Sequence, residues 1–123
     1  MFEIRVKHKF TARHALTNYN GATEGSHSHE WLCEAFIRSE NLDEAGCAVD
    51  FIKVDEALSE VTSKIEGSDI NAHPFFKGES PSAENVAFFI FRELESKIDT
   101  RSAKLVRVTI SEDPDHAASF IRE

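Results

Sequence analysis

The longest regular pattern in the chain is an alternation of side-chain types over its first fourteen residues. The odd positions are mostly charged, and the even positions carry apolar side chains and two histidines, namely Phe2, Ile4, Val6, His8, Phe10, Ala12 and His14. Alternate residues of a β-strand point to opposite faces of a sheet. The pattern therefore predicts a long strand with one face in the core, and His14 is the last residue of that face.

A second alternation runs from about His27 to Ser39, and its expected core face is His27, His29, Trp31, Cys33, Ala35 and Ile37. If the two strands pair antiparallel, the connection 15–26 brings His14 beside His27 and His29. Neutral imidazoles bind Zn²⁺ well, and a catalytic zinc takes three protein ligands and keeps one position open. We therefore expect a three-histidine metal site at one end of the core. The alternative is that these are half-buried strand histidines, hydrogen-bonded and inert.

Two stretches in the middle of the chain have the apolar spacing of amphipathic helices. The first is expected to be capped by Asp50 and to end at Gly67, and its apolar positions are Val54, Leu58, Val61 and Ile65. The second is expected to be capped by Ser80 or Ser82, with Pro81 in its first turn, and its buried stripe is Val86, Phe89, Ile90, Leu94 and Ile98. The polar residues 68–80 between them predict a long connection.

The C-terminal part predicts two further strands, Lys104–Glu112 and Ala117–Arg122, joined by a turn. Glu112 keeps the register of the apolar set Val106, Val108 and Ile110, so its carboxylate would point toward the core side. A buried carboxylate needs a partner, which makes Glu112 a candidate site residue. If the strand ends one residue earlier, Glu112 is solvated. The order ββ-αα-ββ predicts an α+β fold, with both helices on one face of a four-stranded antiparallel sheet.

Length and charge narrow the function classes. A chain of 123 residues is expected to form one domain, residues 1–123. The net charge of −8 argues against nucleic acid as a partner. We expect no membrane span, because no apolar run has the necessary length. We expect no signal peptide, because the N-terminal residues enter the first predicted strand directly. Cys33 and Cys47 are both expected to be core residues, and we expect no disulfide framework. The absence of disulfides is typical of a cytoplasmic protein.

Five short motifs, in this order along nearly the whole chain, resemble those of the 6-pyruvoyltetrahydropterin synthase family. That family includes the queuosine-pathway enzyme 6-carboxytetrahydropterin synthase. The residues that carry the resemblance are Phe10-Thr11-Ala12-Arg13-His14, His27-Ser28-His29, Val49-Asp50-Phe51, Pro81-Ser82-Ala83-Glu84-Asn85 and Glu112. One difference is Ser28, which stands where the family usually has glycine.

The resemblance implies the tunnelling fold, in which subunits form barrel-shaped trimers that usually stack into hexamers, with active sites between subunits. It implies that His14, His27 and His29 bind Zn²⁺ and that Glu112 anchors the pterin. The metal would polarise the hydroxyls of the substrate side chain, although another divalent ion has similar ligand preferences. The implied function is a carbon–oxygen lyase acting on 7,8-dihydroneopterin triphosphate or a related pterin, by triphosphate elimination or side-chain cleavage.

The chain departs from the family pattern where protons are transferred. Thr23 stands in place of the family's cysteine, and Ile70 in place of the histidine of its Asp-His pair. Some family variants use a glutamate in place of the cysteine, so Glu24 is the candidate base. Asp69 matches the family's aspartate, and His73 or His116 could substitute for the missing histidine. The alternatives are a non-catalytic protein that binds zinc and a pterin on the same scaffold, and a structural oligomer without a ligand.

Overall fold

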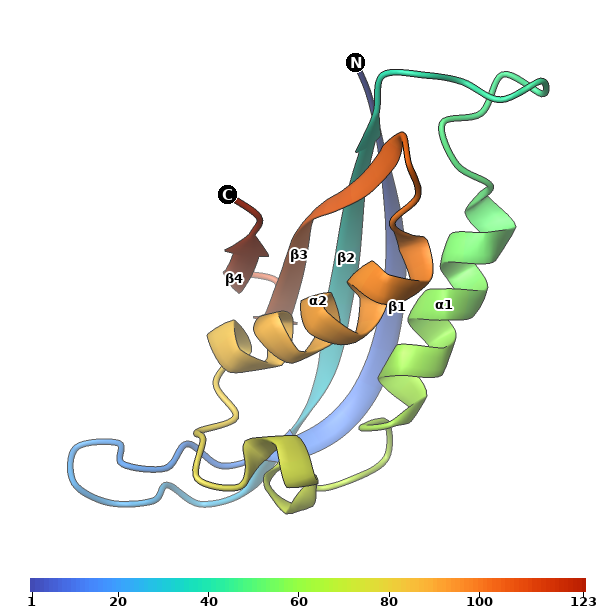
Figure 1. Ribbon diagram of the computed structural model, residues 1–123. Coiled ribbons are helices and arrows are strands. Elements are labelled where there is room, and N and C mark those ends of the chain that lie inside the picture. Colours follow the sequence, from blue (N-terminus) through green and yellow to red (C-terminus); the bar gives the residue numbers. More distant parts are fainter.

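The computed structural model describes residues 1–123 and shows an α+β fold, as predicted. A four-stranded antiparallel sheet has the order β1-β2-β3-β4, and both helices lie on one of its faces (Figure 1). The strands are β1 (Phe2–His14), β2 (His27–Ser39), β3 (Ala103–Asp113) and β4 (His116–Ile121), and the helices are α1 (Phe51–Ser63) and α2 (Ala83–Ile98). The predicted order ββ-αα-ββ is confirmed.

The core lies between the sheet and the helices. β1 and β2 pair without interruption from Phe2 opposite Ser39 to His14 opposite His27, so the two predicted apolar faces coincide. Trp31 has no exposed surface and donates a hydrogen bond from Nε1 to the carbonyl oxygen of Ala12, 3.2 Å away. This bond satisfies the one polar group that the large side chain carries into the core.

The predicted register of β3 is correct only for its second half. The pairing of β2 with β3 shifts between Phe36 and Ile37, and this irregularity changes which β3 side chains face the helices. Leu105 is buried on one side of the shift and Val108 on the other, whereas Val106 is only half-buried. The prediction that Val106 belongs to the core face was therefore wrong, because a bulge interrupts the two-residue period.

The helix starts are capped by side chains. The carboxylate of Asp50 accepts the backbone N–H of Ile52 at 2.9 Å, which confirms the predicted cap of α1. The hydroxyl of Ser82 accepts the N–H of Asn85 at 3.2 Å and caps α2, so Pro81 precedes the cap instead of lying in the first turn.

Helix α1 ends earlier than the sequence predicted. Its last residue is Ser63, and the chain makes further turns before Gly67, which adopts a positive φ of 70°. Glycine adopts this left-handed conformation without steric strain. The connection that follows contains two short 3₁₀ turns that the sequence did not predict, Ile70–Ala72 and Pro74–Phe76.

The two cysteines lie in different environments. Cys33 is buried on the core face of β2, as predicted. Cys47 is exposed, which contradicts the prediction that it is a core residue. It lies in a loop that Asp43 holds by accepting the N–H groups of Ala45 and Cys47, so the backbone turns instead of entering a strand. No helix of the structure has the length and apolar character needed to cross a membrane.

Candidate functional site

The candidate site lies where four strand ends meet. Because the sheet is a meander, β1 ends, β2 begins, β3 ends and β4 begins at the same end of the sheet (Figure 1). His14 is the last residue of β1 and His27 the first of β2, and the two are direct partners across the strands. The polar side chains singled out in the sequence analysis are concentrated at this end.

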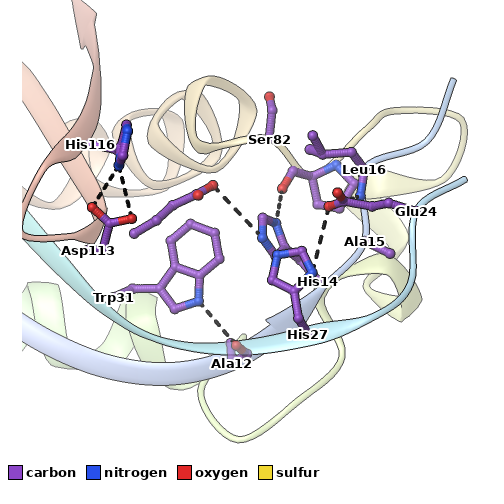
Figure 2. Close-up of polar contacts among 12 residues, drawn as sticks. Ala12, His14, Ala15, Leu16, Glu24, His27, Trp31, Ser82, Asp113 and His116 are labelled. Carbon is purple, nitrogen blue, oxygen red and sulfur yellow. Dashed lines mark hydrogen bonds and ion pairs between the residues drawn. The ribbon is translucent and has the colours of Figure 1, made fainter. Parts of the chain in front are cut away.

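The structure brings the three predicted metal ligands together. One ligating nitrogen each of His14, His27 and His29 lie within 4.8 Å of one another. The ring centroids are 4.5 Å apart for His14 and His27, 5.2 Å for His14 and His29, and 4.6 Å for His27 and His29. The rings meet edge to face, and the close-up shows the His14 and His27 side chains converging (Figure 2).

His14 is held in one orientation by a hydrogen bond that the sequence did not predict. Its side chain is 1% exposed, and its Nδ1 lies 2.7 Å from the carbonyl oxygen of Pro81. A carbonyl only accepts, so Nδ1 carries the proton and Nε2 keeps its lone pair. The second nitrogen of a metal-binding histidine is commonly fixed in this way.

Two buried nitrogens of the cluster have no hydrogen-bond partner, Nε2 of His14 and Nε2 of His29. Buried polar atoms are nearly always satisfied, so two such atoms side by side indicate a missing partner. A divalent cation that prefers nitrogen ligands fits the lone pairs of both. The alternative of hydrogen-bonded, inert histidines accounts for Nδ1 of His14 and Nδ1 of His27, each of which bonds a backbone carbonyl, but gives no partner to these two Nε2 atoms.

The pKa of His14 lies below its usual value of 6.5. Burial is the main cause, since it disfavours the charged imidazolium. The hydrogen bond to Pro81 and the carboxylate of Glu112 act in the opposite direction, and the neighbouring His27 and His29 lower the pKa further. The net effect keeps the imidazole neutral near pH 7, which is the form that binds a metal.

Glu112 points to the same side of the sheet as the cluster. Its Oε1 lies 3.8 Å from Nε2 of His14, and 27% of its side chain is exposed. The pairing of β3 with β4 changes register between Ser111 and Asp113, so Glu112 has no partner on β4. Such bulges are common beside active sites, where they redirect a side chain. The expected orientation of Glu112 is thus observed, with the carboxylate partly open to solvent.

Glu24 closes the loop that joins β1 and β2. Its Oε1 accepts the N–H of Leu16 at 3.0 Å, and its own N–H donates to the carbonyl of Leu16 at 3.1 Å. The same Oε1 lies 3.7 Å from Nδ1 of His27 (Figure 2). Thr23, where the family has cysteine, is exposed. Glu24 is therefore the acidic residue of this loop that lies beside the cluster.

Asp69 and His73 make no contact with the histidine cluster within this chain. Asp69 is exposed and accepts the N–H of Asn71 at 3.1 Å, which caps the first 3₁₀ turn. Nδ1 of His73 accepts the N–H of Phe75 at 3.1 Å, and its ring lies 5.0 Å from that of Phe89. Both residues have local structural partners, and their catalytic roles stay predictions.

His116, the other suggested substitute, is paired with a carboxylate. Its Nδ1 lies 2.8 Å and 3.0 Å from the two carboxylate oxygens of Asp113 in the turn between β3 and β4 (Figure 2). The hydrogen bond from His116 and one from the N–H of Asp115 hold the pKa of Asp113 below its usual value. The pair is exposed, and its side chains hydrogen-bond each other and not the three histidines of the cluster.

Nearly the whole chain matches one protein family. Residues 3–123 match the family described as 6-pyruvoyl tetrahydropterin synthase. A Caenorhabditis elegans relative named "Putative 6-pyruvoyl tetrahydrobiopterin synthase" is 27% identical over 95 residues, which cover 76% of this chain and 67% of the relative.

Solved structures share the fold. The Caenorhabditis elegans 6-pyruvoyl tetrahydropterin synthase superimposes with a TM-score of 0.83 at 23% identity, covering 99% of this chain and 96% of the other. The Plasmodium vivax 6-pyruvoyl tetrahydropterin synthase gives a TM-score of 0.79 at 20% identity, covering 98% and 97%. Variants of the Plasmodium vivax protein replace a catalytic glutamate by alanine or cysteine. The four-stranded sheet with two helices is therefore the tunnelling fold.

Proposed function

Because the chain belongs to the 6-pyruvoyl tetrahydropterin synthase family, we propose that it is a zinc-dependent lyase with His14, His27 and His29 as its metal ligands. The observation that carries this proposal is the pair of buried, unpartnered nitrogens, Nε2 of His14 and Nε2 of His29, inside the three-histidine cluster. The proposed substrate is 7,8-dihydroneopterin triphosphate or a related pterin. The reaction is triphosphate elimination or cleavage of the side chain.

The bound metal would supply Lewis acidity, which lowers the pKa of hydroxyl groups on the pterin side chain. Glu112 orients the ring, because its carboxylate can accept the 2-amino and N3–H groups of a pterin in a two-point contact. The carboxylate makes no hydrogen bond to the protein and is partly exposed, so both oxygens are available to a ligand.

Glu24 is the proposed base. Its Oε1 is occupied by the N–H of Leu16, which leaves Oε2 to accept a proton from the substrate side chain. The catalytic glutamate named for the Plasmodium vivax enzyme is a precedent for a glutamate in this family's chemistry. The side chains of Asp69 and His73 bond only their own turns in this chain. Their proposed role is proton transfer in a site shared between subunits of a homo-oligomer, a trimer or hexamer, as the resemblance to the family implies.

A second candidate is a protein that binds zinc and a pterin without turnover. Thr23 and Ile70 favour it, because neither side chain can replace the thiol or imidazole that the family uses in proton transfer. General acid and base groups are worth roughly 10²–10⁴-fold each, so losing both without a substitute would remove most of the rate.

The test begins with protein purified without chelators, whose metal content is measured by mass spectrometry before and after zinc addition. The zinc-loaded protein is then incubated anaerobically with 7,8-dihydroneopterin triphosphate, and the products are identified by mass. A carboxy-, pyruvoyl- or hydroxymethylpterin supports the lyase and names its branch. Substrate that is unchanged but co-elutes with the protein supports the binding protein, and absence of metal contradicts both.

The role of Glu24 is tested with Glu24→Gln, which keeps an oxygen that can accept the Leu16 N–H but removes the base. Turnover should fall by roughly 10²–10⁴-fold while zinc content is unchanged. Glu30→Gln is the matched control, because Glu30 is an exposed glutamate at the same end of β2. Wild-type turnover in Glu24→Gln would remove Glu24 from the mechanism.

A further inference from the structure

The end of β1 forms backbone hydrogen bonds on both sides. On the side away from β2, its partner is the connection between the two helices. β2 pairs with one side of β1, and residues 67–69 run along the other side. The N–H of Gly67 donates to the carbonyl of Thr11 at 2.6 Å, and the N–H of Arg13 donates to the carbonyl of Ser68 at 2.9 Å. These are two rungs of a short parallel ladder on alternate residues of β1.

The side chain of Asn71 continues this ladder by one more step. The N–H of Ala15 donates to Oδ1 of Asn71 at 2.8 Å, and Nδ2 of Asn71 donates to the carbonyl of Ala15 at 2.9 Å. The backbone has by then turned into the 3₁₀ turn Ile70–Ala72, which Asp69 caps. A side-chain amide has a donor side and an acceptor side, as a peptide group has. Asn71 therefore makes the two hydrogen bonds to Ala15 that a continuing backbone strand would have made.

A second pair of contacts holds the following residues. The hydroxyl of Ser80 accepts the N–H of Thr17 at 3.0 Å, and Nδ2 of Asn85 donates to the carbonyl of Ser80 at 2.8 Å. Pro81, the next residue, is the one whose carbonyl accepts Nδ1 of His14. The backbone after His14 and the acceptor of its side chain are thus fixed by the same connection.

We propose that Asn71 is a positioning residue of the metal centre, fixing the backbone directly after His14 so that its imidazole keeps Nε2 directed at the other two histidines. This inference rests on the proposed function of the three histidines as metal ligands. β1 ends at His14, so the strand ladder with β2 does not restrain the chain beyond that residue. The two bonds to Ala15 provide that restraint. Partners that bond a metal ligand directly typically affect metal affinity by about 10–100-fold, and Asn71 bonds the residue next to the ligand.

The test compares the zinc dissociation constants of the wild type, Asn71→Ala and Asn71→Asp, measured by competition with a chromophoric chelator. Asn71→Ala should bind zinc about 10-fold more weakly, at the lower end of the range for direct partners of a ligand. Asn71→Asp keeps an acceptor for the Ala15 N–H but sets a carboxylate oxygen against the Ala15 carbonyl oxygen, so it too should bind zinc more weakly than the wild type. Asn41→Ala is the control, because Asn41 is exposed and its side chain makes no hydrogen bond.

Thermal unfolding of the metal-free variants separates positioning from simple stability. A residue with only a structural role would lower the melting temperature and leave the zinc affinity of the folded protein unchanged. That result, in either Asn71→Ala or Asn71→Asp, overturns the inference while leaving the proposed function intact. Weaker zinc binding by a variant that still unfolds cooperatively supports it, and a wild type that binds no zinc overturns both proposals.

Discussion

His14 and Glu112 face each other at the end of the sheet, with Nε2 of the imidazole 3.8 Å from Oε1 of the carboxylate. This distance is too long for a hydrogen bond. The imidazole nitrogen is therefore free for an ion, and the carboxylate is free for a different ligand beside it. The two strands that carry them are separated by β2, so the geometry depends on the sheet as a whole.

Replacing Glu112 should separate pterin binding from metal binding. Hydrogen bonds to a charged group contribute about 1.5–3 kcal/mol, so Glu112→Gln should weaken pterin binding by about 10–100-fold. Zinc content should not change. The measurement is fluorescence titration with a pterin, with Asp115→Asn as the control because Asp115 is exposed in the neighbouring turn. A loss of zinc in Glu112→Gln would instead make this carboxylate a metal ligand.

The stability of the metal-free protein should depend on pH through His14. Burial lowers the pKa of His14 from 6.5 in the folded state, so the unfolded chain binds more protons as the pH falls below that value. The contribution of His14 to the free energy of unfolding should therefore be largest above about pH 6.5 and decrease below it, until the pH passes the folded pKa. Urea denaturation over this range measures the effect. In His14→Gln the dependence should be smaller, and an equal dependence would contradict the assignment.

The cap of α2 should contribute measurably to stability. Ser82→Ala removes the acceptor of the Asn85 N–H and should lower the free energy of unfolding by about 0.5–2 kcal/mol. Ser96→Ala, on the exposed side of the same helix, should change it by less than about 0.5 kcal/mol. Urea denaturation of both variants provides the comparison. Equal effects would mean that the Ser82 hydroxyl does not act as a cap.

The two thiols should react at very different rates. Cys47 is exposed, whereas Cys33 is buried and burial raises the pKa of its thiol. An aromatic disulfide reagent should therefore label Cys47 in the native protein and Cys33 only after denaturation. Cys47→Ala should show no rapid labelling. Rapid labelling of Cys33 in that variant would reveal opening of the core around β2.

Features that depend on residues close together in the chain could be predicted from the sequence. The two-residue period gave the bounds of β1 and β2, and the hairpin they form fixes His14 opposite His27. The caps Asp50 and Ser82 were also among the predicted residues, because a cap is a local bond between a side chain and the next turn. Family motifs then agreed with the register of the histidines.

The features that could not be predicted arise from contacts between distant parts of the chain. The bonds of Asn71 to Ala15 and of His14 to Pro81 join segments that have no common pattern. Asp69 and Asn71 have the spacing of an ordinary turn, which gives no sign that the Asn71 side chain bonds Ala15. Cys47 was assigned to the core because it adjoins a stretch that the sequence predicted to be extended, residues 47–49, but whether such a stretch enters a strand depends on how the loop packs.

The position of the ligands along the chain has a consequence for the order of folding. All three imidazoles belong to the single hairpin of β1 and β2, and contacts so close in sequence form with a small entropic cost of loop closure. The imidazoles can therefore meet early, before the C-terminal strands dock. Pro81 and Glu112 come from much later in the chain. If the three histidines bind a metal as proposed, the hairpin alone would hold it weakly and the affinity would rise as the later segments pack. The metal affinity would then measure how far folding has progressed.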